Sequence, residues 1–141
     1  MSRLSPLRIT VVCVIIAAGV GVFGWVMVQG FLKGYRTVQY VAQTVAHERK
    51  ILDACKRYAG EHAGNFPPSL DALFPAYLSD RAVLVSPLKQ DEPLGYIYTP
   101  PSANDVNSAD FIVVEDQYAP SVLHRRLCCF ADGHFKGFPA P

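Results

Sequence analysis

The chain has 141 residues, of which 50% are hydrophobic and 18% are charged, and its formal net charge at pH 7 is +1. Once a membrane segment is set aside, this length is enough for one small domain and too short for two. The near-zero charge and the lack of a basic block give no electrostatic reason to expect nucleic acid or an acidic substrate as a partner.

The first predicted element is a membrane-spanning helix. The twenty positions Ile9–Val28 are almost wholly apolar and carry no charge. At about 1.5 Å per residue they span about 30 Å, the thickness of a bilayer's hydrocarbon core. A cleaved secretory signal is the alternative, but the run is longer than a signal core and no A-x-A site follows it. We therefore expect a retained anchor, with the C-terminal part of the chain outside the cytoplasm because the leading tail is short.

The second predicted element is an amphipathic helix that continues from the span without a proline. Apolar residues recur at spacings of three, four or seven, which is typical of one apolar helix face. Polar residues such as Glu48 are expected elsewhere around the helix. Leu52, Cys55 and Ala59 form the distal part of the apolar face. We call its proximal part, which a small head could not reach, the assembly stripe: Phe31, Tyr35, Val38, Ala42 and Val45.

This helix is expected to end near Gly64. Glycine fits a helix C-cap, and Pro67-Pro68 cannot continue a helix. Ser69 is the expected N-cap of a short helix over Leu70–Leu78, and Ala82–Val85 forms a short apolar run.

Strand signals occupy the last third of the chain. Aromatic and β-branched residues predict strands at Gly95–Thr99 and Phe111–Val114. Two further strands, Arg125–Ala131 and His134–Phe138, flank Asp132-Gly133, a strong hairpin signal. The predicted fold is α+β, with a long N-terminal helix, transmembrane in its first part, packed against a small antiparallel sheet of three or four strands. The expected parts are a tail and membrane segment (1–30), an extramembrane helix (31–64) and a globular head (65–141).

Several short motifs occur in a familiar order. The junction Tyr58–Leu73 (YAGEHAGNFPPSLDAL), the strand Gly95–Tyr98 (GYIY) and the closing Phe130–His134 (FADGH) resemble segments of type IV pilin-like proteins, especially the major pseudopilin of type II secretion systems. The resemblance implies a pilin-like fold and a structural role in a type II secretion or type IV pilus-like assembly of the bacterial inner membrane. It implies other pilin-like subunits as partners, including copies of this chain.

One part of the family pattern is missing. Type IV pilins carry a prepilin peptidase site that ends in Gly, then Phe, with a Glu five residues into the mature chain. Here the apolar run opens with Leu7-Arg8-Ile9-Thr10 and has neither feature. The alternative function is therefore a membrane-tethered, monomeric binding or sensing domain with a pilin-like fold.

The candidate metal ligands are Asp132, His134 and His124. Carboxylate oxygens suit calcium and imidazole suits zinc, and the family resemblance implies at most a calcium ion near this end of the chain. The structural alternative is that Asp132-Gly133 is a turn that needs a positive φ, with His134 opening the next strand. No other cofactor is expected.

A Cys–His hydrolase is the enzymatic hypothesis, with Cys128 or Cys129 beside one of the histidines. Such a nucleophile needs an exposed, electropositive position, whereas a cysteine inside the apolar run Leu127–Phe130 is typical of a small core residue. We therefore expect no catalytic residues and no enzymatic activity. Whether Cys55 pairs with either of the adjacent cysteines stays open.

Overall fold

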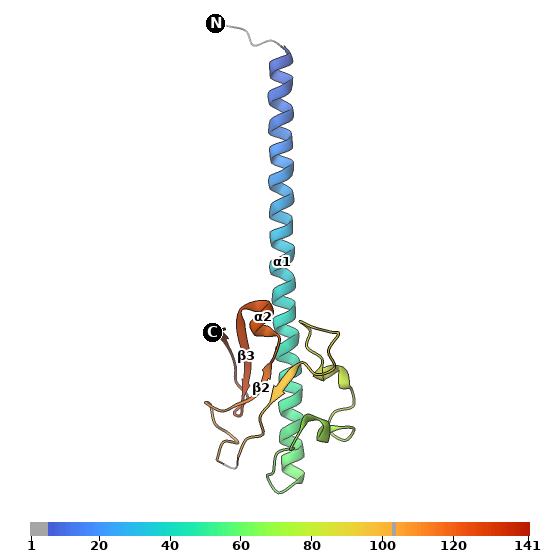
Figure 1. Cartoon of the computed structure of the whole chain (residues 1–141), viewed down its shortest axis with the longest axis vertical. Coiled ribbons are helices and arrows are strands. Elements are labelled where there is room, and N and C mark those ends of the chain that lie inside the picture. Colours follow the sequence, from blue (N-terminus) through green and yellow to red (C-terminus); the bar gives the residue numbers. More distant parts are fainter. Residues whose placement is uncertain (1–5, 103) are drawn as a thin grey trace. The chain divides into compact units, whose positions relative to one another are not determined.

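The computed structural model describes the backbone of residues 6–102 and 104–141, and the side chains of these residues apart from 6–14 and 16. The chain divides between Val38 and Gln39 into two compact units. A continuous helix, α1 (Pro6–Glu61), runs through the first unit and into the second (Figure 1).

In the first unit, the described side chains of α1 are almost all exposed. The large apolar residues here are well exposed, among them Phe23 at 63%, Trp25 at 67% and Phe31 at 75%. Among the residues that the structure describes, no helix contains a segment both long enough and apolar enough to cross a membrane. The predicted span, Ile9–Val28, lies partly outside the residues whose side chains are described.

The second unit contains a four-stranded antiparallel sheet in the order β1-β2-β3-β4. Its strands are β1 (Tyr96–Tyr98), β2 (Ile112–Asp116), β3 (Arg125–Phe130) and β4 (Phe135–Pro139). The predicted α+β class and antiparallel meander are confirmed, with four strands. Each strand lies within two residues of its predicted bounds, because the aromatic and β-branched runs and the Asp132-Gly133 turn are strong local signals.

The core of the second unit lies between one face of α1 and the inner face of the sheet. Ile51 and Cys55 of the helix are fully buried, as are Val114 and Cys129 of the sheet, and all four belong to one apolar cluster. The pairing of Val114 with Cys129 in the β2–β3 ladder places these two side chains on the same face of the sheet. Leu70 and Leu73, from the segment after α1, also belong to this cluster.

The buried face of α1 is wider than the predicted one: Leu52, Cys55 and Ala59 are buried as expected, and two polar residues join them. Thr44 and Glu48 are both 0% exposed and continue into Ile51 and Cys55 at helical spacing. The expectation that Glu48 lies elsewhere around the helix was therefore wrong. The apolar pattern could not reveal a carboxyl in the core, because periodicity treats every ionisable residue as solvated.

The helix α1 ends as predicted, but the short helix predicted after it is shorter in the structure. Gly64 has a φ of 85° and donates its N–H to the carbonyl of Ala59 at 2.8 Å, which closes the C-terminus of α1. The following helix is only a 3-10 turn, η1 (Leu70–Leu73), and the Ser69 side chain caps none of its described N–H groups. A capping bond appears instead at η2 (Arg81–Leu84), where the Asp80 carboxylate accepts from Ala82 N at 2.8 Å.

Two short elements were not predicted: η2, where only an apolar run was expected, and the helix α2 (Ala119–Leu123). The helix α2 joins β2 to β3 and packs on β3. Its sequence is too short for a helical period to be recognised, and its N-terminus is stabilised by Asp116 rather than by its own N-cap residue.

Candidate functional site

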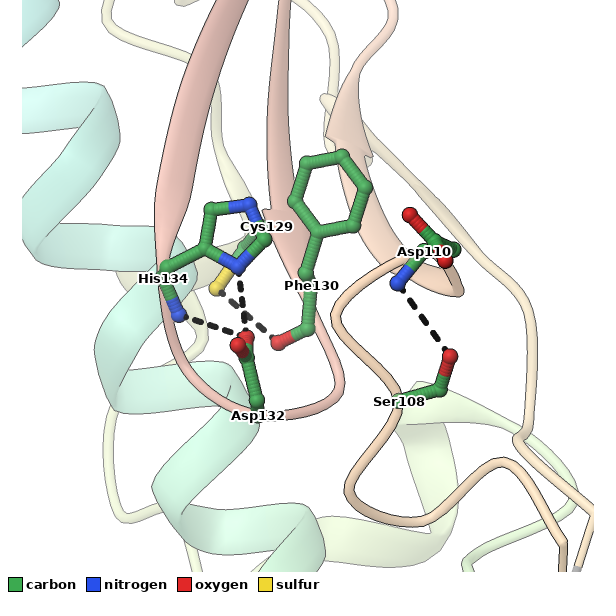
Figure 2. A network of polar contacts seen from close by, with 6 residues as sticks. All are labelled: Ser108, Asp110, Cys129, Phe130, Asp132 and His134. Atoms are coloured by element: carbon green, nitrogen blue, oxygen red, sulfur yellow. Dashed lines mark hydrogen bonds and ion pairs between the residues drawn. The ribbon is translucent and has the colours of Figure 1, made fainter.

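The predicted metal ligands Asp132 and His134 do lie together, in the turn between β3 and β4. Asp132 Oδ1 accepts the backbone N–H of His134 at 2.9 Å and lies 2.7 Å from His134 Nδ1 (Figure 2). The backbone N–H of His134 is the main reason why the pKa of Asp132 is lowered. Gly133 has a φ of 100° and donates its N–H to the carbonyl of Phe130 at 2.9 Å. The Asp132 carboxylate therefore stabilises the β3–β4 turn by accepting a backbone hydrogen bond, as the structural alternative predicts.

His124 lies at the other end of the same hairpin. It follows α2 in the left-handed region, with a φ of 53°, and its carbonyl accepts the N–H of Ala140 at 3.1 Å. The ladder pairs Arg125 with Pro139 and Cys129 with Phe135, so the length of the hairpin separates His124 from His134. The described part of the chain holds no cluster of three or more His, Cys, Asp or Glu residues suited to a metal ion.

The three cysteines whose side chains the structure describes are buried thiols. Cys55, Cys128 and Cys129 are free and fully buried. Burial raises the pKa of Cys55 and Cys129 to about 12 and that of Cys128 to about 11. At neutral pH these thiols are protonated, whereas a cysteine nucleophile acts as an exposed thiolate.

The structure reveals a buried polar cluster that the sequence did not indicate. Asp116, at the end of β2, is 0% exposed and accepts four hydrogen bonds. Oδ1 accepts the backbone N–H groups of Tyr118 at 2.8 Å and Ala119 at 3.0 Å. Oδ2 accepts the hydroxyls of Ser86 at 2.7 Å and Thr44 at 3.4 Å. This carboxylate therefore connects α1, the loop after η2 and the start of α2.

Glu48 belongs to the same cluster but has no such donors. Both of its carboxylate oxygens, and the hydroxyl of Tyr96, are buried without a hydrogen-bond partner among the described residues. Burial, followed by the nearby charge of Asp116, raises the pKa of Glu48 to about 9. Burial likewise raises the pKa of the Tyr96 hydroxyl. The only sequence signal for this site is the spacing of Thr44, Glu48, Ile51 and Cys55, which continues the apolar face through two polar residues.

The assembly stripe falls on both units. Phe31, Tyr35 and Val38, in the first unit, are 75%, 57% and 68% exposed. In the second unit Ala42 is exposed and Val45 is half-buried.

A shallow hollow lies on the sheet beside the hairpin. Its volume is about 560 Å³, and Phe130, His134, Lys136 and Phe138 are among the residues that line it. The His134 ring stacks on Phe130 with 4.2 Å between ring centroids. The hollow combines aromatic surface with basic groups.

Comparisons of the chain with models of protein families, with curated proteins and with solved structures find no match.

Proposed function

We propose that this protein is a membrane-anchored, pilin-like structural subunit or accessory protein of a type II secretion or type IV pilus-like assembly. One observation carries the proposal. From Ile15 to Val38, α1 presents one large apolar side chain after another, and most of these are more than half exposed. Apolar surface on this scale is stable only when lipid or protein covers it.

Lipid is the proposed cover for the N-terminal part of this surface. The run Ile9–Val28 has the length and the lack of charge of a membrane-spanning helix. Trp25 lies near the C-terminal end of the run, where interfacial aromatic residues are common. The proposed location is the bacterial inner membrane, with the second unit outside the cytoplasm.

Neighbouring subunits are the proposed cover for the assembly stripe beyond the run. Phe31, Tyr35 and Val38 recur at intervals of four and three residues, so they share one face of α1. The proposed mechanism is lateral packing, in which the apolar faces of parallel helices from several subunits come together. The order of the pilin-like motifs supports this reading.

Crosslinking tests the assembly. In a Cys13→Ser background, the variant Val38→Cys is expected to give crosslinked dimers and larger species in membranes with a short thiol crosslinker. The matched control is Gln39→Cys, which is also exposed but faces about 100° away around the helix. We expect several-fold more product from Val38→Cys. Equal yields, together with an intact Met1-Ser2 terminus by mass spectrometry, would contradict assembly.

A membrane-tethered, monomeric binding or sensing domain is the second candidate. The hollow lined by Phe130, His134, Lys136 and Phe138 favours it, because it offers aromatic and basic groups to a ligand. The absence of the Gly-Phe junction and the Glu from the start of the apolar run points the same way. A monomer in membranes, with no Val38→Cys product at any crosslinker length, would favour this candidate over the first.

A further inference from the structure

The buried cluster around Glu48 has too much negative charge for its surroundings. Glu48 and Asp116 are both 0% exposed, and each contributes a carboxyl group to the same interior. Asp116 is satisfied by four donors, whereas neither oxygen of Glu48 accepts a hydrogen bond of normal geometry from the described residues. The backbone N–H of Asp116 acts to lower the pKa of Glu48, but burial raises that pKa by more. An ionised carboxylate that is buried and unpaired costs several kcal/mol or more. Glu48 therefore needs a neutralising partner.

The groups that face this cluster do not provide a positive charge. The titratable sheet residues that act on this cluster are Tyr96, Asp116 and Cys129 on the inner face, with Glu115 and Cys128, which pair with each other on the outer face. Each of these is neutral or negative. Arg126 of β3 is a cation, but it pairs with Glu115 through two contacts of 2.6 Å.

The helix and the loop after η2 give no positive charge either. His47 lies beside the cluster, with its ring edge toward Tyr96 at a centroid distance of 6.3 Å and Nδ1 at 3.3 Å from the carbonyl of Val85. Burial lowers the pKa of His47, which favours its neutral form. Arg49 is exposed on the helix, and Ser86, in the loop, contributes a hydroxyl that Asp116 already uses. Lys56 is half-buried two turns further along α1, and its Nζ lies beside Gly133 in the β3–β4 turn.

We propose that Glu48 binds a proton as a structural ligand, and that the neutral carboxyl holds the second-unit part of α1 against the sheet. A proton neutralises the charge and needs no additional space, which suits oxygens that have no accessible surface. The Glu48 O–H is then a donor and can use an oxygen of the cluster as acceptor, such as the unpaired hydroxyl of Tyr96. This proposal concerns the second unit alone and holds whether or not the protein assembles.

The consequence is a fold that weakens in alkali. The unfolded chain releases the Glu48 proton near pH 4.5, whereas the folded chain keeps it up to about pH 9. Stabilisation by the proton is therefore complete below about pH 4.5 and is lost progressively as the pH rises to about 9. Within this window, Glu48 raises the ratio of unfolded to folded protein by up to about tenfold per pH unit.

The test combines a direct titration with a matched variant. The full chain, in detergent micelles and labelled with ¹³C at glutamate Cδ, is titrated by NMR from pH 4 to pH 10. We expect one glutamate signal to stay at its protonated position through pH 7 and to disappear in Glu48→Gln. Unfolding by denaturant should then show a clear loss of stability from pH 5 to pH 8 in the wild type and a much smaller loss in Glu48→Gln, because Gln mimics the neutral carboxyl.

Glu92→Gln is the control, because Glu92 is partly exposed and pairs with Lys89 at the surface. The pH dependence of this variant should match that of the wild type. If every glutamate signal titrates below pH 6, the proposal is wrong. This titration uses the wild-type protein, so its result does not depend on whether the Glu48→Gln variant folds. If added calcium stabilises the wild type at pH 8 but leaves Glu48→Gln unchanged, the neutralising ligand is a cation, which also overturns the proposal.

Discussion

Gly95 occupies a position where two backbone segments approach closely. Its N–H donates to the carbonyl of Leu84 at 2.7 Å, and its carbonyl accepts the N–H of Gln117 at 3.0 Å. A Cβ at this position would lie 2.8 Å from Ser86 Cα and even closer to the backbone nitrogen and Cβ of the same residue. Any side chain would therefore push Ser86 away and disturb its hydrogen bond to Asp116.

Gly95→Ala should consequently destabilise the second unit by about 2–3 kcal/mol, the upper part of the range typical of overpacking, because the Ser86 backbone cannot yield. The matched control is Gly60→Ala in α1, where a Cβ meets no described atom within 4 Å. That substitution should stabilise the helix by up to about 1 kcal/mol. Equilibrium denaturation of both variants measures the difference, and equal stabilities would contradict the close approach.

At the scale of single residues, the sequence predicted the backbone conformations that depend on residues adjacent in the chain. The Asp132-Gly133 turn and the positive φ of Gly64 follow from local chemistry and were predicted. The proximity of Asp116 to Glu48 was not, because it joins residues far apart in the chain. The candidate metal ligand His124 lies far from Asp132 and His134, and this separation already follows from the predicted strands of the β3–β4 hairpin, whose length lies between them.

Among the elements, α2 depends on an uncommon backbone conformation at its end. His124 has φ and ψ of 53° and 32°, a left-handed conformation that costs a residue with a Cβ about 1 kcal/mol or more relative to glycine. This residue reverses the chain between α2 and β3. Its side chain is exposed, so the backbone conformation is the main structural demand at this position.

His124→Gly should therefore stabilise the protein by about 0.5–1 kcal/mol, after the larger entropy of glycine in the unfolded chain is subtracted. His124→Ala keeps the Cβ and serves as the control, with no expected gain. Thermal unfolding of the two variants checks the prediction. A loss of stability in both would indicate that the imidazole makes a contribution beyond the backbone.

The strands and α1 were predictable because each carries a repeated local pattern. The short elements were harder to predict. η1 and α2 have only four and five residues, so their residues fit several local conformations. The contacts of η1 with the core and of α2 with β3, rather than their own propensities, stabilise them.

At the scale of the whole molecule, the apolar core belongs to one of the two units. Every residue of its cluster lies between Ile51 and Ala131, within the unit that begins at Gln39. The hydrophobic driving force for folding this unit is therefore contained in its own sequence. The exposed apolar side chains of α1 up to Val38 add no residue to this cluster.

A fragment of residues 39–141 should accordingly fold by itself and remain monomeric without detergent, whereas the full chain should require detergent. Dispersed amide NMR signals and a cooperative unfolding transition would verify this. The matching fragment of residues 31–141 retains Phe31, Tyr35 and Val38 and should associate at lower concentration. If the fragment of residues 39–141 showed no cooperative unfolding transition, the division of the chain into two units would be contradicted.

The buried thiols also report how often the second unit opens transiently. Cys55, Cys128 and Cys129 have no exposed surface and are protonated at neutral pH, so an alkylating reagent modifies them only while the chain is transiently open. In a Cys13→Ser background, the rate of labelling in intact cells reports the frequency of that opening. Cys55 lies on α1 and the other two on β3, so unequal rates would identify which part of the second unit separates first.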